Sequence, residues 1–127
     1  MTEARRRGVL VVEDEEGLRT LFAAILEMEN YMVYTAANGH DGLAILGIHG
    51  DSIDLMITDL TLPQLGGLEL ISLVRAQRPA IKLIGISGHA DDDVVASVLK
   101  AGADAFIPKP FLPNDAITKV REILSRP

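Results

Sequence analysis

The feature of this sequence that most constrains its fold is an alternation, repeated five times, of a short apolar run with a segment of helical spacing. The apolar runs are residues 9–12, 32–34, 53–57, 81–86 and 105–107. Several are nearly continuous rather than alternating, which is typical of strands buried on both faces of a parallel sheet. Five such units therefore predict an α/β protein with a doubly wound, five-stranded parallel sheet.

The segments between the runs carry apolar residues three and four positions apart, as one face of a helix requires. The clearest segment is the first, with Leu18, Leu21, Phe22, Ile25 and Leu26. Residues 68–74, 94–99 and 117–124 follow the same rule, whereas residues 43–48 form a shorter and weaker pattern. We therefore expect five helices, of which the second has the shortest helical pattern.

Capping and helix-breaking residues mark the ends of these predicted helices. Asp14 or Glu15 can cap the first helix, and Asp91 can cap the fourth. Pro79 follows the third helix, and Gly102 ends the fourth. The periodicity and the end signals thus agree on the positions of the helices.

The composition limits the kinds of site that the chain can hold. A chain of 127 residues is of single-domain length, and 48% of its residues are hydrophobic, enough for a core without covalent staples. The absence of cysteine excludes a disulfide scaffold, a cysteine-ligated zinc site and a cysteine nucleophile. Any catalytic or binding chemistry must therefore rest on other side chains.

The net charge of the chain limits the classes of molecule that it is expected to bind. A net charge of −6 argues against direct binding of nucleic acid, which needs a basic face. The basic run at residues 5–7 is interpreted as a solvated tail rather than a targeting signal. Since no apolar stretch approaches the ~20 residues of a membrane span, we expect no membrane association. The absence of cysteine fits the expected cytoplasmic location.

Polar residues follow four of the five predicted strands. They are Glu13 and Asp14 after the first, Asp59 after the third, Ser87 after the fourth and Lys109 after the fifth. The carboxyl ends of parallel strands meet at one edge of the sheet, where ligands bind in such folds. Singly, each residue has an ordinary explanation as a helix cap, a turn residue or a surface charge. Together they predict a site.

This set of residues indicates phosphoryl chemistry with a divalent metal. Three close carboxylates repel one another and must take up a proton or a cation at neutral pH. Ligands that are all oxygen atoms suit Mg²⁺. Aspartate can act as a nucleophile and form an aspartyl-phosphate, while the Lys109 ammonium and the Ser87 hydroxyl can bind phosphoryl oxygens.

The chain resembles a known family, the receiver domains of bacterial response regulators, in two-component signalling. The motifs VLVVEDEEGLR, DLMITDLTLPQLGGLEL, LIGISGHAD and GADAFIPKPF carry the resemblance, in the order and spacing of the family. The resemblance implies a flavodoxin-like sheet with the strand order 2-1-3-4-5. It also implies a receiver domain at residues 8–125 after an N-terminal tail at residues 1–7.

The resemblance assigns roles to the residues at the strand ends. Asp59 corresponds to the phosphoacceptor, and Ser87 and Lys109 correspond to the residues that bind the phosphoryl group. The Lys109-Pro110 bond corresponds to the family's cis peptide bond. The domain is expected to catalyse only its own phosphorylation and dephosphorylation, so it is not predicted to be an enzyme in the ordinary sense.

The resemblance also implies a Mg²⁺ site and two further functions. The metal ligands would be Asp14, Asp59 and the main-chain carbonyl of Thr61, with Glu13 acting mainly through bound water. Phe106 and Ser87 correspond to the switch residues. Thr61 and His89 occupy the positions that tune the lifetime of the phosphoryl group, and neither side chain suits the orientation of an attacking water.

The expected partners follow from the same resemblance. The phosphoryl donor would be a histidine kinase or a histidine phosphotransfer protein. Phosphorylation would change the surface formed by the fourth helix, fifth strand and fifth helix, which a downstream effector or a fused output domain reads. The domain is expected to be a monomer or a weak homodimer.

Three alternatives differ in the chemistry that they assign to the acidic residues. The first is a small haloacid-dehalogenase-like phosphohydrolase, in which Asp14 would be the nucleophile. The second, a flavin-binding module, is disfavoured because acidic residues 13–16 stand where a phosphate-binding loop would be. The third is a pseudo-receiver without phosphorylation, which the presence of Asp59, Ser87 and Lys109 disfavours.

Overall fold

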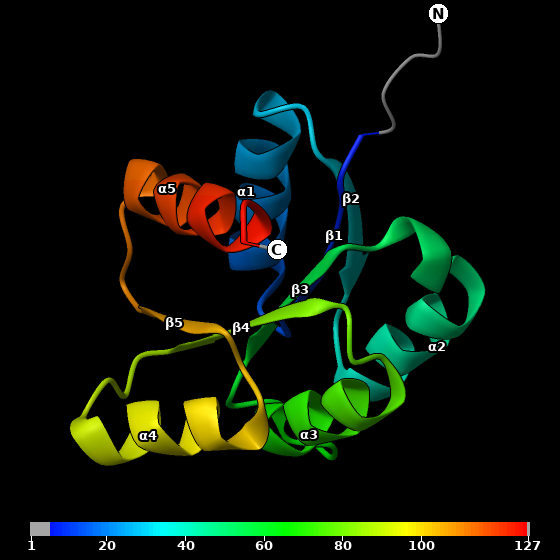
Figure 1. The fold of residues 1–127 in the computed structure, drawn as a ribbon. Coiled ribbons are helices and arrows are strands. Elements are labelled where there is room, and N and C mark those ends of the chain that lie inside the picture. The colour runs from blue at the N-terminus through cyan, green and yellow to red at the C-terminus, as the bar shows by residue number, and fades with distance from the viewer. Residues whose placement is uncertain (1–5, 127) are drawn as a thin grey trace, which may run out of the picture.

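The computed structural model describes residues 6–126, which form one parallel sheet with helices on both faces (Figure 1). The strands are β1 Gly8–Val12, β2 Met32–Ala36, β3 Leu55–Asp59, β4 Lys82–Ser87 and β5 Ala105–Pro108. The helices are α1 Glu16–Met28, α2 Gly39–His49, α3 Gly67–Gln77, α4 Asp92–Ala101 and α5 Pro113–Leu124, and a 3-10 turn spans Gly50–Ser52. Most of the predicted tail, residues 1–5, lies outside the described residues.

The sheet has the predicted topology. Its strand order is β2-β1-β3-β4-β5, and every neighbouring pair is parallel. The order reverses at β1, so the connection to β2 runs one way and the connections to β3, β4 and β5 run the other. The doubly wound fold and the order 2-1-3-4-5 are therefore confirmed.

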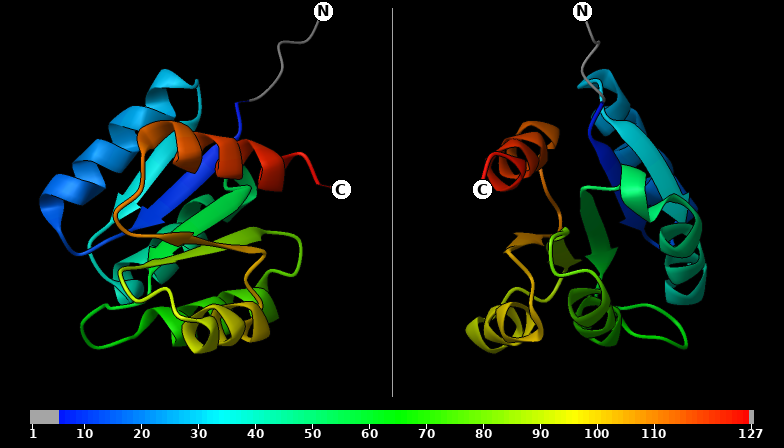
Figure 2. Two further views of the ribbon diagram at one scale, coloured as in Figure 1. Left: turned by 90° about the vertical axis from the view of Figure 1, so that its left-hand side faces the viewer. Right: turned by 45° about the vertical axis from the view of Figure 1, so that its right-hand side comes forward.

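Two hydrophobic layers hold the helices to the sheet. One layer lies under α1 and α5 and includes Phe22, Ile57 and Val120. The other lies under α2, α3 and α4 and includes Leu46, Met56 and Val98. Figure 2 shows the two groups of helices on opposite sides of the strands. Each strand alternates its side chains between the two layers, which is why the central strands are apolar at nearly every position.

Burial separates the central strands from the edge. All five residues of β1 and all five of β3 are buried. In contrast, β2 lies at an edge of the sheet and exposes Met32 and Thr35. The apolar run at β2 was accordingly one of the two shortest, residues 32–34. Within residues 6–126, no helix combines the length and apolar character that a membrane span would need.

Two strands begin later than the apolar runs that predicted them, and one helix is longer than predicted. Ile53 and Ile81 are buried but precede β3 and β4, since a buried apolar residue can lie in a turn as well as in a strand. Helix α2 has 11 residues instead of the predicted short segment. The Asn38 side chain caps it by accepting the Asp41 N–H at 2.8 Å. Small residues Gly39 and Gly42 on its buried side obscured the helical pattern.

The predicted end of α4 is confirmed, and the predicted cap of α1 is wrong in part. The Asp91 carboxylate accepts the Val94 N–H at 2.9 Å, and Gly102 ends α4 with φ = 120°, a conformation that favours glycine. Glu15 occupies the N-cap position of α1, but its side chain makes no capping hydrogen bond. The Glu13 carboxylate instead accepts the Glu15 N–H at 3.1 Å.

Candidate functional site

The parallel sheet brings the predicted site residues to one edge. Asp59 is the last residue of β3, and Ser87 is the last residue of β4. Glu13 and Asp14 follow β1 directly, and Lys109 follows β5. Because all five strands run in the same direction, these residues share the carboxyl edge, as predicted.

Lys109 joins two buried carboxylates at this edge. Its Nζ forms an ion pair with Asp59 Oδ2 and lies 2.9 Å from Glu13 Oε1. Glu13 is 1% exposed and Asp59 is 4% exposed, so both carboxylates are largely shielded from water. The peptide bond between Lys109 and Pro110 is cis, as the family resemblance implied. One ammonium group therefore neutralises part of the charge of two acids.

The backbone around Asp59 positions its carboxylate. Asp59 Oδ1 accepts the Thr61 N–H at 2.9 Å, and the Thr58 hydroxyl donates to the Asp59 carbonyl at 3.0 Å. Gly67, at the start of α3, lies so close that a Cβ there would collide with the Asp59 carbonyl oxygen and with the Leu60 Cα. The start of α3 thus packs directly against the backbone of Asp59 and Leu60.

Three carboxylates are close enough to share one cation. Oxygen atoms of Glu13, Asp14 and Asp59 all lie within 4.8 Å of one another. Asp14 is exposed while the other two are buried, so the group opens to solvent on the Asp14 side. Glu13 Oε1 is buried and lies 2.9 Å from the ammonium group of Lys109. Three carboxylates next to one ammonium group leave an excess of negative charge, and an all-oxygen set of this kind fits a hard divalent cation such as Mg²⁺.

The electrostatics of the cluster are those of crowded acids next to one base. Burial raises the pKa of Glu13 to about 7, and the nearby Asp59 charge acts in the same direction. Burial alone would lower the pKa of Lys109, but its hydrogen bonds to Asp59 and Glu13 outweigh this effect and raise the pKa. The ammonium group therefore stays charged at neutral pH, whereas the Glu13 carboxyl group is partly protonated there.

Three of the residues expected to bind or tune the phosphoryl group line one pocket at the carboxyl edge. Ser87 is 2% exposed, and its Oγ accepts the His89 N–H at 3.0 Å. Thr61, Ser87 and His89 line a pocket of about 320 Å³ together with residues from α3 and α4. Ser87 follows Ile86, which pairs with Asp59 across the sheet. The structure thus brings these three residues together.

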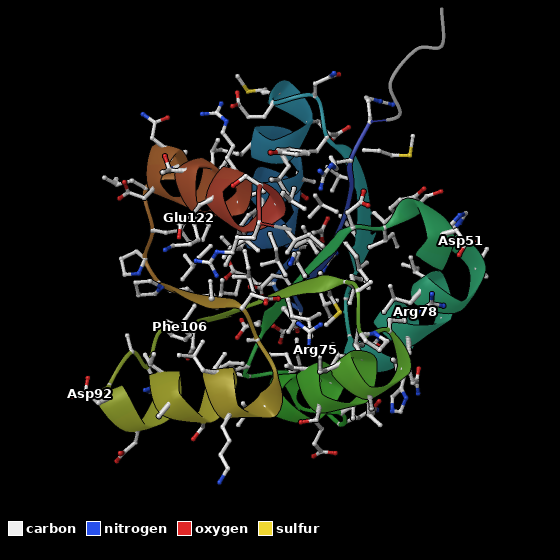
Figure 3. The ribbon with its side chains drawn as sticks, viewed as in Figure 1. Asp51, Arg75, Arg78, Asp92, Phe106 and Glu122 are labelled. Carbon is white, nitrogen blue, oxygen red and sulfur yellow. The ribbon has the colours of Figure 1, made fainter. Side chains whose placement is uncertain are left out.

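Phe106 lies on β5 and is only partly buried. It packs against the core layer under α2, α3 and α4, and in Figure 3 it lies between β5 and α4. Its partner across the sheet is Gly85, where a Cβ would press on Val98 of α4. The side chain is therefore neither fully enclosed nor free, and its switching role stays a prediction.

Two residues that support the site were not predicted from the sequence. Arg19 Nη1 donates to the carbonyl oxygens of Glu13, at 2.9 Å, and of Asp14, at 3.4 Å, and so fixes the acidic loop. Gly67 allows the loop after β3 to close. The signal for Arg19 was its place one turn into the helix that follows the acidic pair. For Gly67, the signal was the Gly66-Gly67 pair before an apolar helical pattern.

Comparisons with known proteins agree with this arrangement. Residues 9–121 match the family model described as response regulator receiver domain. The transcriptional regulatory protein CpxR of Escherichia coli K12 is 36% identical over 120 residues, 93% of this chain and 49% of CpxR. The sensor kinase CckA of Brucella abortus strain 2308 is 33% identical over 118 residues, 93% of this chain and 12% of CckA. The chain thus spans half the length of these relatives or less.

Solved structures show the same fold. A CheY-like response regulator receiver domain protein from Methanospirillum hungatei has a TM-score of 0.86 and 35% identity, with 94% of each chain covered. CheY from Borrelia burgdorferi, in a complex with CheX, BeF3 and Mg²⁺, has a TM-score of 0.90 and 25% identity, with 94% and 90% covered. The alternative of a haloacid-dehalogenase-like phosphohydrolase finds no support here. The chain belongs to the response regulator receiver domain family of two-component signalling.

Proposed function

We propose that Asp59 is the phosphoacceptor of this receiver domain. The observation that carries the proposal is the ion pair between Lys109 and Asp59 inside an acidic cluster at the carboxyl edge of the sheet. Asp59 differs from Asp14 because it is buried and held by the Thr61 N–H, whereas Asp14 is exposed. A carboxylate held in one orientation is prepared for in-line attack on a phosphorus atom.

The transfer is a substitution at phosphorus. A carboxylate oxygen of Asp59 forms a bond to the phosphorus atom, and the bond from phosphorus to the donor's leaving atom breaks. With phosphoramidate, the bond that breaks joins phosphorus to nitrogen, and ammonia leaves. The Lys109 ammonium then moves from the free carboxylate to an oxygen of the new acyl phosphate, whose negative charge it offsets. The Ser87 hydroxyl, whose oxygen already accepts the His89 N–H, keeps its proton to donate to a second phosphoryl oxygen.

Glu13, Asp14 and Asp59 would hold Mg²⁺, together with the main-chain carbonyl of Thr61. When bound, the ion would reduce the repulsion between the acids and the negatively charged donor. The position of the buried Glu13 carboxylate beside Asp14 and Asp59 supports a role for Glu13 on the metal side, directly or through water. In the absence of the ion, Lys109 pairs with both Glu13 and Asp59 and offsets part of the repulsion between them.

Incubation with phosphoramidate and Mg²⁺, followed by intact mass spectrometry, tests the proposal. We expect the wild-type protein to gain one phosphoryl group and the Asp59→Asn variant to gain none. An Asp14→Asn variant is the matched control, because it removes a carboxylate from the same cluster and should slow the gain without abolishing it. A gain in Asp59→Asn but not in Asp14→Asn would assign the acceptor to Asp14 and overturn the proposal.

Ser87 and Phe106 would form the switch, and Thr61 and His89 would set the lifetime of the phosphoryl group. The partial burial of Phe106 against the layer under α4 supports a change of packing as its role. Thr61 and His89 line the pocket beside Ser87, where a hydrolytic water would approach. Neither side chain carries a carboxylate or amide, so self-dephosphorylation would be moderate or slow. An unchanged hydrolysis rate in Thr61→Asn would contradict this role for Thr61.

The partners would be a histidine kinase or a histidine phosphotransfer protein upstream and an effector or an output domain downstream. CpxR, a transcriptional regulator, and CckA, a sensor kinase, are both longer than this chain and support either arrangement. The α4–β5–α5 surface would change on phosphorylation. The domain would catalyse only its own phosphorylation and dephosphorylation, in the cytoplasm, as a monomer or a weak homodimer.

A further inference from the structure

Basic side chains surround a pocket at the amino edge of the sheet, opposite the acidic site. The pocket has a volume of about 650 Å³ and lies between the start of β1, the 3-10 turn, the α3–β4 connection and the end of α5. Its charged lining residues are Arg7, Asp54, Arg78, Lys82 and Arg126. Four cations and one acid thus meet in a chain whose net charge is −6.

Arg78 is held in place by its surroundings. Its Nη2 donates to the Leu46 carbonyl, near the end of α2, at 2.6 Å (Figure 3 shows Arg78 next to α2). Its guanidinium group fills the space where a side chain at Gly50 would begin, so a Cβ at Gly50 would collide with it. A cation that is already fixed loses little conformational entropy when it binds an anion.

Arg7 and Arg126 approach the pocket from the two ends of the described chain. Arg7 Nη1 donates to the Leu124 carbonyl at 3.2 Å, and Arg126 forms an ion pair with Glu122 at 2.9 Å. Figure 2 shows the end of α5 at the same end of the sheet as the start of β1. Within residues 6–126, Arg7 and Arg78 donate to carbonyl oxygens and form no ion pair with a carboxylate.

The geometry points to a ligand with two or more phosphate groups. Carbonyl oxygens at helix ends offset only part of a guanidinium charge. The remaining N–H groups of a planar guanidinium match two phosphate oxygens at once. Small-molecule sites typically have volumes of roughly 300–1,000 Å³, and this pocket is within that range. We propose that the arginine pocket, defined by Arg7, Arg78 and Arg126, binds a small polyphosphate such as a nucleotide.

Calorimetric titration with two probes tests the proposal and identifies the recognised group. Inorganic pyrophosphate and ATP are titrated into the protein with a chelator present, so that no divalent ion can gather phosphate at the acidic site. We expect saturable binding of both probes. Equal affinities would show that the phosphates alone are recognised, and tighter binding of ATP would show that the nucleoside also contributes. Amide resonances of Gly8, Gly50 and Arg78 should shift on binding.

Matched variants locate the site. Arg7→Gln and Arg78→Gln should each weaken binding about tenfold, the effect of one charge-assisted hydrogen bond. Lys100→Gln, on the exposed surface of α4, removes the same charge far from the pocket and should leave affinity unchanged. Arg7 is exposed and outside the strands, so its variant keeps the test valid if Arg78→Gln folds poorly.

Three results would overturn the proposal. They are the absence of saturable heat with both probes, an equal loss of affinity in Lys100→Gln, and resonance shifts confined to Asp59 and its neighbours. Binding of an acidic peptide, but not of pyrophosphate, would likewise replace a small polyphosphate with a protein partner. None of these results bears on phosphorylation of Asp59, which is measured separately by intact mass.

Discussion

The two edges of the sheet carry charge in opposite ways. At the carboxyl edge, Glu13 and Asp59 are buried and share one ammonium group, Lys109. At the amino edge, exposed or half-buried arginines such as Arg7 and Arg78 donate to carbonyl oxygens. Charges in the first group depend on one another because water cannot replace a lost partner. Charges in the second group remain solvated and are nearly independent.

Electrostatic destabilisation of the folded state is concentrated at the carboxyl edge. Like charges crowded together in a buried cluster destabilise the fold until a cation or a proton relieves them, and that cost favours the binding of a metal. A group of cations that stays in contact with water destabilises the folded state little, and it attracts anions without lowering stability. Charge-removing variants at the two edges should therefore differ in how far they lower the free energy of unfolding.

Removal of Lys109 should have the largest effect. Lys109→Gln leaves Glu13 and Asp59 close together without an ammonium group, so the free energy of unfolding in metal-free buffer should fall by about 3 kcal/mol. Urea unfolding followed by circular dichroism measures the change, and Mg²⁺ should restore part of it. The control Lys119→Gln removes an exposed cation 3.5 Å from Glu122 and should change stability by less than about 0.5 kcal/mol.

A double variant identifies the cause of that effect. If repulsion between the two acids is responsible, Lys109→Gln should cost clearly less in an Asp59→Asn background. An equal cost in both backgrounds would show that Lys109 acts by packing instead.

The pH dependence of stability should report Glu13. Its pKa is about 7 in the folded protein against an ordinary value of 4.5, so between these values the folded state binds more protons than the unfolded state. Stability from this group is therefore present below pH 4.5 and is lost as the pH rises to about 7, with a total of up to about 3 kcal/mol. The chain has many other carboxyl groups, so the measured quantity is the difference between wild type and Glu13→Gln.

That difference should vary with pH in chelator and shrink when Mg²⁺ is present. A pH-independent difference between the two proteins, measured by urea unfolding at several pH values, would contradict the raised pKa of Glu13.

A methyl group at Gly67 should disturb the carboxyl edge through the backbone. The new Cβ of Gly67→Ala would collide with the Asp59 carbonyl, so we expect a loss of about 2 kcal/mol in stability and slower phosphorylation. Gly66→Ala is the control, because its methyl group would have no neighbour within 4 Å. It should cost less than about 1 kcal/mol. Equal losses would show that the close approach at Gly67 has no special role.

The smallest effect is expected at the amino edge. Arg126→Gln removes the pair with Glu122, in which both side chains are about half exposed, and should change the free energy of unfolding by less than about 0.5 kcal/mol. The measurement is the same urea titration, in low salt and in high salt. A loss comparable to that of Lys109→Gln would erase the contrast between the two edges.

Much of the fold followed from patterns that are local in sequence. The nearly continuous apolar runs at β1, β3 and β4 predicted buried parallel strands because both faces of those strands are covered. Asp91 and Gly102 marked the ends of α4 because capping depends on a few neighbouring residues. The weak helical pattern of α2 failed to predict its length, since Gly39 and Gly42 pack closely without adding hydrophobicity.

The sequence predicted which residues lie at the candidate site, but not the contacts between them. The strand ends predicted that Glu13, Asp14, Asp59, Ser87 and Lys109 would share an edge, and the motif match supplied their proposed roles. No sequence pattern indicated that Glu13 would be more deeply buried than Asp14, or that it would accept the Glu15 N–H and lie beside Lys109. Residues adjacent in sequence point in different directions as they leave a strand, and only the packing around them decides which is buried.

The sequence by itself determined the α/β class, the positions of the strands and the acidic, all-oxygen character of one edge, because these depend on periodicity and residue type. Only the tertiary structure decided that Lys109 would pair with two acids, that Gly67 would lie against the Asp59 carbonyl, and that Arg7, Arg78 and Arg126 would surround one pocket. These contacts join residues that are far apart in the chain. Their distances depend on how all the helices pack on the sheet.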